Sequence, residues 1–172
     1  GTADRMPTSG DVVRWLAPTI LRKAARRLTS RPVVPHWRMA VRRHASGLAD
    51  GASAPDLTGF RWIESPRDRI YADPFLFGHQ GDTWVFFEDY DRPAGKGVLS
   101  AAPISAEGLG PVVPVLDRPY HLSYPCVFRD GGDLFMIPET HGSGRVELYR
   151  CQTFPSGWVF ERELFRAPAV DT

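Results

Sequence analysis

A pattern that recurs after 51 residues is the feature that most constrains the fold of this chain. Residues 71–89 have the sequence YADPFLFGHQGDTWVFFED, and residues 122–140 have the sequence LSYPCVFRDGGDLFMIPET. The positions that an offset of 51 pairs with an identical residue are Pro74/Pro125, Phe77/Phe128, Gly81/Gly132, Asp82/Asp133 and Glu88/Glu139. These matches fall at turns and at the ends of apolar runs, so we interpret the pattern as a repeated structural unit.

Each copy of the unit contains four short apolar runs separated by turns rich in Gly, Pro and Asp. The first copy has runs at 73–77 and 83–87, then VLSAAPI and PVVPVL; the second has runs at 124–128 and 134–138, then RVELYRC and WVFERELF. Such runs predict strands, and four strands in about 50 residues is the period of a propeller blade. We therefore predict an all-β fold, a partial β-propeller of a five-bladed type. The alternative is an antiparallel sandwich in which two hairpins resemble each other by chance.

The predicted domains follow from this pattern and from an uneven charge distribution. Residues 60–172 would hold blade one (about 71–118), blade two (about 121–166) and the start of a third blade. Residues 1–45 carry ten Lys and Arg against two Asp and Glu, and the spacing of apolar residues predicts a helix from about 11 to 28. These residues form the predicted basic helical arm, and residues 46–59 form a linker.

Three partners remain open for the basic arm: the rest of the chain, an anionic membrane surface and nucleic acid. Nucleic acid is disfavoured, because no basic motif is interleaved with aromatic residues. No run reaches 18 apolar residues and no apolar signal-peptide core is visible, so we expect a cytoplasmic protein, with the membrane periphery as the alternative. Cys126 and Cys151 lie in apolar strands and favour free buried thiols, and we expect neither metal nor cofactor.

The hairpins also predict where a functional site lies. A turn near Gln80 and Gly81 brings Asp73 level with Phe87 or Glu88, and the matching turn brings Tyr124 level with Pro138 or Glu139. Because the first strand of each blade lines the central channel, polar side chains gather at one end of it. The candidate residues are Asp73, Glu88, Asp89, His121, Tyr124, Glu139 and His141. The structural alternatives are that Glu88 and Glu139 bond to neighbouring blades or exposed backbone, and that Asp73 is a turn residue.

The segments YADPFLF, FFEDYD, GKGVLS, PYHLSYPCVF, GDLFMIPET and VELYRC resemble a known domain. It is the N-terminal propeller of glucosamine inositolphosphorylceramide transferases and their bacterial relatives, similar in turn to five-bladed propellers of glycoside hydrolase family 43. The resemblance spans roughly residues 60–172. It implies that Asp73 occupies the position of a general base, that Tyr124 replaces a second carboxylate, and that the general acid would come from a later blade.

Three functions are consistent with these residues. The first is recognition of a carbohydrate or glycolipid in glycan or glycolipid synthesis or modification. The second is a furanosidase-type hydrolase with Asp73 as general base; an active chain would be a glycosyl hydrolase or part of a glycosyltransferase. The third is a non-catalytic structural domain or one that binds a membrane surface.

The end of the sequence raises further expectations. The segment ELFRAPAVDT resembles the approach to a third inner strand, and Asp171 would fall near the column of Asp73 and Tyr124. Two blades cannot close a ring, so we expect a fragment, or a partial propeller that associates with another copy through its open edge. The bias toward Arg, Ala, Pro and Gly suggests a bacterial origin.

Overall fold

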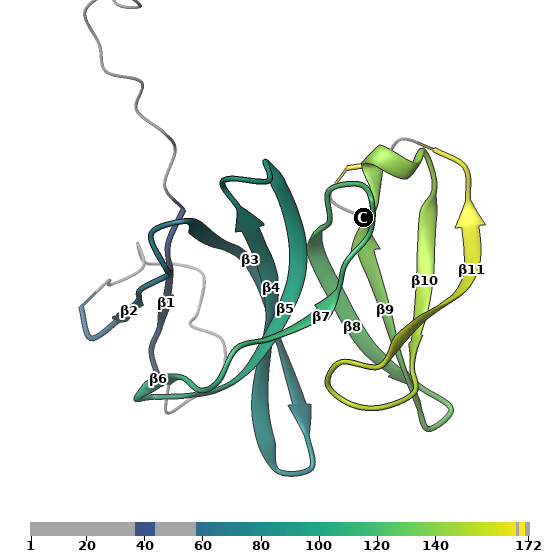
Figure 1. Cartoon of the computed structure of the whole chain (residues 1–172). Helices are drawn as coiled ribbons and strands as arrows, with labels where there is room; N and C mark the ends of the chain where they lie inside the picture. The colour runs from purple at the N-terminus through teal and green to yellow at the C-terminus, as the bar shows by residue number, and fades with distance from the viewer. Residues whose placement is uncertain (1–36, 44–57, 168, 171–172) are drawn as a thin grey trace, which may run out of the picture. The chain divides into compact units, whose positions relative to one another are not determined.

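The computed structural model describes residues 37–43, 58–167 and 169–170 (Figure 1). All of them belong to one compact unit, residues 37–172. The helix expected over 11–28, most of the expected linker and Asp171 lie outside the described residues. Within the part that is described, no helix has the length and apolarity needed to span a bilayer.

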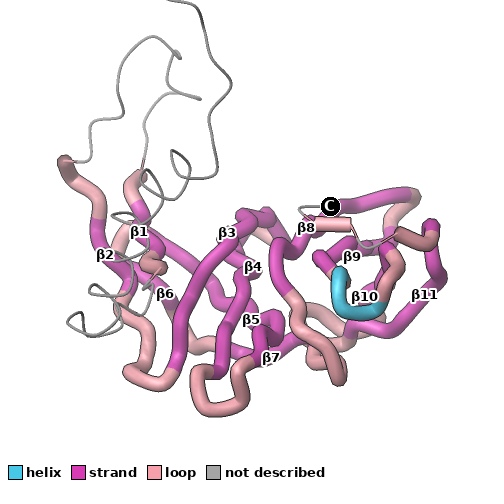
Figure 2. The backbone as a smooth tube through the Cα atoms, turned by 90° about the horizontal axis from the view of Figure 1, so that it is seen from above, coloured by secondary structure: helices cyan, strands magenta, loops and turns pink. Residues whose placement is uncertain are grey.

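Two antiparallel sheets follow each other along the chain and lie side by side (Figure 2). The first sheet contains β3 (Arg69–His79), β4 (Asp82–Asp91) and β5 (Lys96–Ser105), and both β6 (Gly108–Leu109) and β7 (Val113–Leu116) pair with β5. The second sheet contains β8 (Ser123–Asp130), β9 (Asp133–Glu139), β10 (Val146–Cys151) and β11 (Trp158–Phe165), in that order. The all-β class and the expected strands are confirmed, with β6 as an addition.

The sequence repeat is reproduced in the pairing of the strands. The β3–β4 hairpin pairs Phe75 with Phe86, and the β8–β9 hairpin pairs Cys126 with Ile137, which are the positions 51 residues later. Every other β8–β9 pair also has its counterpart in β3–β4. Both hairpins turn through two residues of positive φ, at 80–81 and at 131–132, the geometry of a tight turn that matches the twist of its strands.

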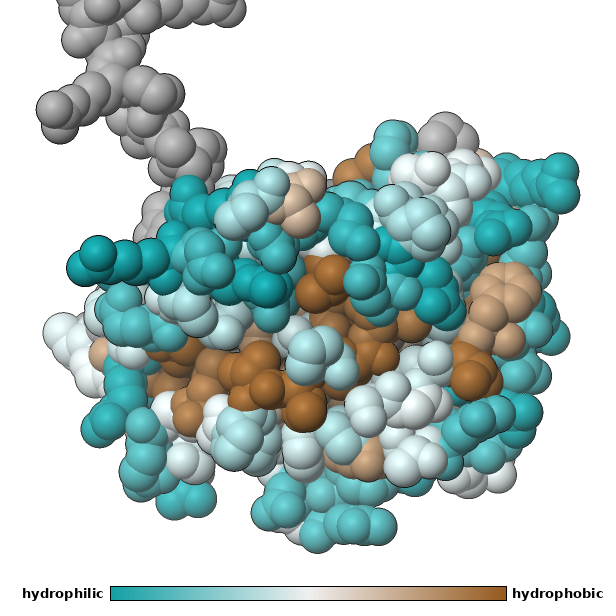
Figure 3. Space-filling view, viewed as in Figure 1, coloured by the Kyte–Doolittle hydropathy of each residue, from teal (hydrophilic) through white to brown (hydrophobic). Residues whose placement is uncertain are grey.

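A shared hydrophobic core joins the two sheets. Phe86 and Leu99 of the first sheet lie in one buried cluster with Met136 and Trp158 of the second. Rings of the first sheet extend the core by contacting Phe154, which lies between β10 and β11. The centroid of the Phe154 ring lies 3.9 Å from that of the His79 ring and 5.0 Å from that of the Trp84 ring. Some apolar surface stays outside the core. Figure 3 shows it as a band of apolar side chains that crosses this face of the molecule over β5 and β7.

The first sheet has a second apolar cluster, completed by residues that the sequence placed in the arm. The strand β1 (Met39–Val41) pairs with β2 (Arg61–Ile63), and the buried side chains of Met39 and Ile63 pack with Val85 and Phe87. Residues 39–41, which the sequence assigned to the arm, therefore form a strand. The difference has a physical reason: strand pairing over more than 20 residues of sequence leaves no local periodicity, and three residues are too short to show alternation.

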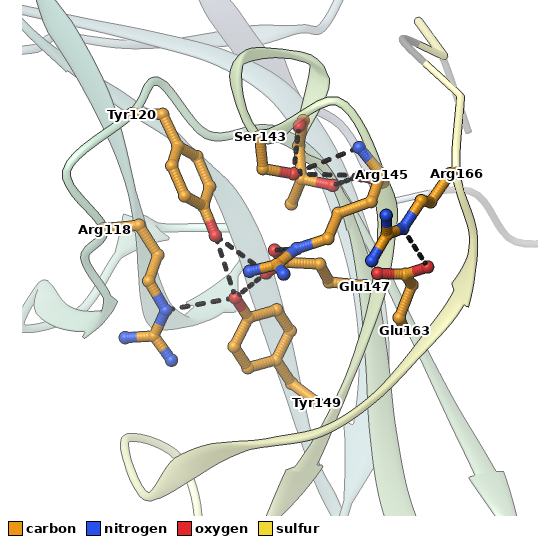
Figure 4. A network of polar contacts seen from close by, with 9 residues as sticks. Arg118, Tyr120, Ser143, Arg145, Glu147, Tyr149, Glu163 and Arg166 are labelled. Atoms are coloured by element: carbon orange, nitrogen blue, oxygen red, sulfur yellow. Dashed lines mark hydrogen bonds and ion pairs between the residues drawn. The ribbon is translucent and has the colours of Figure 1, made fainter.

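A buried carboxylate ties the second sheet to the segment that enters it (Figure 4). Glu147 of β10 is almost fully buried and accepts hydrogen bonds from Tyr120 at 2.7 Å, from Arg145 Nε at 2.6 Å and from Tyr149. Burial opposes ionisation, but the bonds from Tyr149, Tyr120 and Arg145 outweigh it and lower the pKa of Glu147. Tyr120 belongs to the link between the sheets, so this network anchors that link.

The shared core predicts which side chains of the first hairpin set stability. Replacing the fully buried Phe86 with Ala should lower the free energy of unfolding by about 3–5 kcal/mol, because it leaves a cavity between the sheets. Leu76 on β3 is 62% exposed, so Leu76→Ala should cost less than about 0.5 kcal/mol. Chemical denaturation followed by tryptophan fluorescence measures both, and equal losses in the two variants would contradict a core shared by the sheets.

Candidate functional site

The first strand of each sheet, β3 and β8, carries a bulge at the same point of the repeat. In β3 the register with β4 shifts between Ala72 and Phe75. In β8 the register with β9 shifts between Ser123 and Cys126, the equivalent positions. The first residue of each bulge has a left-handed backbone, with φ of 49° at Asp73 and 48° at Tyr124, and a proline follows each one. Left-handed non-glycine residues are uncommon and cluster at functional sites, so the two bulges point to a site.

Three carboxyl groups gather beside the bulges, as the hairpin geometry predicts. Ala72 pairs with Glu88 and Ser123 with Glu139, so the two glutamates stand beside the bulges that contain Asp73 and Tyr124. Burial is the main reason that the pKa of Glu88 rises to about 7, and the charges of Asp73 and Glu139 and a hydrogen bond with Asp73 contribute. Glu88 is therefore protonated in a large share of molecules at neutral pH.

His121 completes the polar group. Its Nδ1 accepts a hydrogen bond of 2.9 Å from the backbone N–H of Gly97, so neutral His121 carries its proton on Nε2, which lies 3.4 Å from Glu88 Oε1. Burial lowers the pKa of His121, although the negative charges of Glu139 and Asp73 act against that shift. At neutral pH the imidazole can therefore donate a proton in a hydrogen bond without carrying a full charge.

A glycine makes this close approach possible. A Cβ on Gly97 would lie 2.5 Å from the carbonyl oxygen of Leu122 and 2.9 Å from Glu88 Oε1. No side chain fits at such distances, so Gly97 lets β5 approach the segment that carries His121. Sequence reasoning did not single out Gly97 as a site residue, although it lies in the GKGVLS segment that carries the family resemblance.

A groove of about 580 Å³ opens along the two bulges. Its lining comes from three segments, residues 37–40, 72–75 and 124–126. Most of this surface is apolar, with the carboxylate of Asp73 as an acidic group and Tyr124, 46% exposed, as an aromatic one. Trp37, also part of the lining, was missed in the sequence, because nothing local distinguishes it from the basic segment around it.

The sequence also placed Asp89, His141 and Asp171 at this site. Asp89 is buried, accepts a hydrogen bond of 3.0 Å from Ser100 and lies 3.4 Å from Arg69, and its charge adds to the raised pKa of Glu88. Alternation along β4 turns it to the face opposite Glu88. His141 is exposed at the start of the 3-10 helix η1 (His141–Ser143), two residues beyond Glu139. Asp171 lies outside the described residues.

The polar side chains of the site supply both hydrogen-bond acceptors and donors. Over the described residues, the His, Cys, Asp and Glu side chains form no group of three or more with the geometry to hold a metal. Both cysteines are free thiols and only half buried, where the sequence suggested full burial. The arrangement instead offers ionised carboxylates, a proton shared by Asp73 and Glu88, and a neutral imidazole donor.

Comparison with known proteins places the chain in a family. The model of the family described as "Glucosamine inositolphosphorylceramide transferase 1, N-terminal" matches residues 52–172. The chain belongs to this family. Glucosamine inositolphosphorylceramide transferase 1 of Arabidopsis thaliana is 38% identical over 104 residues, and the protein of that name from Oryza sativa subsp. indica is 36% identical over 107. Each match covers 59% of the chain and 14% of the relative, so the chain spans about one seventh of their length.

A solved structure supports the fold. The α-L-arabinofuranosidase from Lactobacillus brevis superposes with a TM-score of 0.50 over 63% of this chain and 40% of its own. The identity is 17%, so the likeness concerns the fold alone. The family resemblance seen in the sequence is thus confirmed. The matched relatives are plant proteins, which speaks against the bacterial origin suggested by composition.

The proton held by Glu88 predicts a specific dependence of stability on pH. The folded pKa of about 7 exceeds the ordinary value of 4.5, so Glu88 stabilises the fold fully below about pH 4.5 and loses this contribution as pH rises through 7. Glu88→Gln keeps a neutral group of the same shape. The free energy of unfolding of this variant should therefore rise, relative to that of the wild type, by up to about 3 kcal/mol between pH 4.5 and pH 8.

Urea denaturation at pH 4.5, 6 and 8 measures this difference. The control is Glu161→Gln on β11, an exposed carboxylate paired with Arg150, which should track the wild type at each pH within about 0.5 kcal/mol. Parallel pH profiles for Glu88→Gln and the wild type would show that Glu88 titrates normally in the folded protein.

Proposed function

We propose that this chain recognises the carbohydrate part of a glycan or glycolipid during its synthesis or modification. The observation that carries the proposal is the pair of equivalent left-handed bulges, which present Asp73 and Tyr124 in one groove beside Glu88 and Glu139. Membership in a family named for a glycolipid-forming transferase supports the same substrate class. Sugar binding falls to Asp73, Glu88, Glu139, His121 and Tyr124.

The chemistry of these groups fits a sugar. Carboxylates accept hydrogen bonds from hydroxyl groups, and bonds to charged acceptors are stronger than bonds between neutral groups. His121 donates through Nε2, so the group can bind both the hydrogen and the oxygen of neighbouring hydroxyls. An exposed ring such as that of Tyr124 offers an apolar face to the C–H side of a sugar, with a polar group at its tip.

Hydrolysis is less well supported by the same geometry. Glycosidases place two carboxyl groups on either side of the scissile bond, at about 5 Å or more from each other. Asp73 and Glu88 share a hydrogen bond, so no sugar bond fits between them. Glu88 has the raised pKa of a general acid, but its proton is directed at Asp73 rather than at a leaving group. The hydrogen-bonded pair of Asp73 and Glu88 therefore favours recognition, and a hydrolase would need Asp73 to act with a general acid other than Glu88.

Binding of simple sugars tests the proposal. The relatives' name directs the choice of glucosamine and myo-inositol as probes, with arabinose added because of the structural neighbour. Isothermal titration calorimetry should detect one or more of them. Asp73→Asn, which keeps the shape and tolerates the left-handed backbone, should weaken binding by about tenfold or more, since it removes a charged acceptor.

The matched control is Asp133→Asn at the start of β9, an exposed position beside a turn, which should bind as the wild type does. Failure to bind any probe, or equal binding by Asp73→Asn, would overturn carbohydrate recognition at these carboxylates. Release of free sugar from an arabinose-containing oligosaccharide would favour the hydrolase instead.

A further inference from the structure

We propose that the groove along the bulges binds two linked sugar rings, one beside Asp73 and Tyr124 and a second at a subsite in which Trp37 provides the stacking surface. The proposal rests on the function proposed above and adds to it the size of the ligand and a residue from outside the repeat. Asp73 belongs to the cluster of carboxyl side chains through its hydrogen bond with Glu88, and it also lines the groove. The groove therefore continues directly from the carboxylates.

Trp37 is both exposed and held in place. Two residues later, Met39 is buried against Ile63 and Tyr71, and the pairing of β1 with β2 fixes its backbone. The intervening Arg38 bonds to both carboxylate oxygens of Glu64, at 3.0 and 3.2 Å. Trp37 itself is nevertheless 69% exposed. The contacts of its neighbours therefore hold this segment in place without burying Trp37.

Exposure alone would mean little, because single apolar residues are common on protein surfaces. The position of Trp37 is what distinguishes it. It lines the same groove as Tyr124 and Asp73, whereas Trp62 of β2, which is 55% exposed, lines a different hollow with Glu107 and Val112. The groove thus has two exposed aromatic rings and one carboxylate, and Pro74 and Pro125 add apolar surface that offers no side-chain hydrogen bond.

This lining suits the two sides of a sugar ring. The aromatic and proline surfaces match the C–H face, while hydroxyls at the edge of the ring reach Asp73. A volume of about 580 Å³ lies within the range of about 300–1,000 Å³ that is usual for small-molecule sites. One ring beside Asp73 and Tyr124 and a second ring on Trp37 make use of the whole lining.

Linked and separate sugars test for two subsites. The probes are glucosamine, myo-inositol and the compound in which glucosamine is glycosidically linked to inositol, each titrated into the whole chain by calorimetry. If two subsites exist, the linked compound should bind about tenfold or more tighter than the better of its halves, because the second ring binds at high effective concentration. In Trp37→Ala this advantage should disappear, while the affinity for the better half stays within about twofold.

Two further variants sharpen the test. Trp62→Ala removes an exposed ring that does not line the groove and should keep the full advantage of the linked compound. Trp37→Phe retains a ring and should keep part of it. Thermal denaturation shows whether each variant is folded, and an exposed ring predicts unchanged midpoints.

The outcomes separate this proposal from the proposed function. If single sugars bind but the linked compound gains nothing, or if Trp37→Ala keeps the gain, the subsite is overturned and recognition at the carboxylates stands. If Trp62→Ala loses the gain as fully as Trp37→Ala, the role of the groove is likewise overturned. If no probe binds to the wild type, the proposed function fails and the subsite with it.

Discussion

The packing of the first sheet on the second is the interaction on which the remaining structure depends. Phe86 and Trp158 meet edge to face with ring centroids 5.9 Å apart, inside a cluster that draws on both sheets. This core holds β3, the first strand of one sheet, against β8, the first strand of the other. Two bulges that are 51 residues apart in sequence therefore line one groove. Without that contact, Asp73 and Tyr124 would belong to separate surfaces.

The bulges convert this packing into a site. A regular strand would turn successive side chains to opposite faces, whereas a bulge with a left-handed residue redirects one of them. Holding a bulky residue such as Tyr124 in that conformation costs free energy, of the order of 1–3 kcal/mol, that the surrounding sheet must offset. The strain is present in both copies, so it is a property of the repeated unit rather than an accident of one hairpin.

The hairpins were predictable because their signals are local. Gly81 and Gly132 mark tight turns, and the turn alone sets the pairing that brings Glu88 beside the bulge at Asp73. Asp89 accepts its hydrogen bond from Ser100 on the face of β4 opposite to Glu88, as alternation along a strand predicts, since neighbours on a strand face opposite ways. Trp37 could not have been found, because its place depends on β1 pairing with β2, a long-range contact without a local pattern.

The raised pKa of Glu88 likewise needed the structure. The sequence placed Glu88 and Asp73 at the same end of the hairpin, but their hydrogen bond and the nearby charge of Glu139 depend on how the sheets pack. Two facing carboxyl groups in a half-buried place relieve their repulsion by retaining a proton. That retained proton makes Glu88 a hydrogen-bond donor to Asp73.

The repeat also explains why the groove is chemically asymmetric. The backbone at 73 and at 124 is nearly identical, with the same φ, the same following proline and a glutamate beside each bulge. On this common scaffold one bulge carries a carboxylate and the other a phenol ring. A ligand that lies across both bulges therefore meets an acidic side and an aromatic side. Since the backbone is the same in both copies, the specificity of such a site is carried by the side chains at which the copies differ.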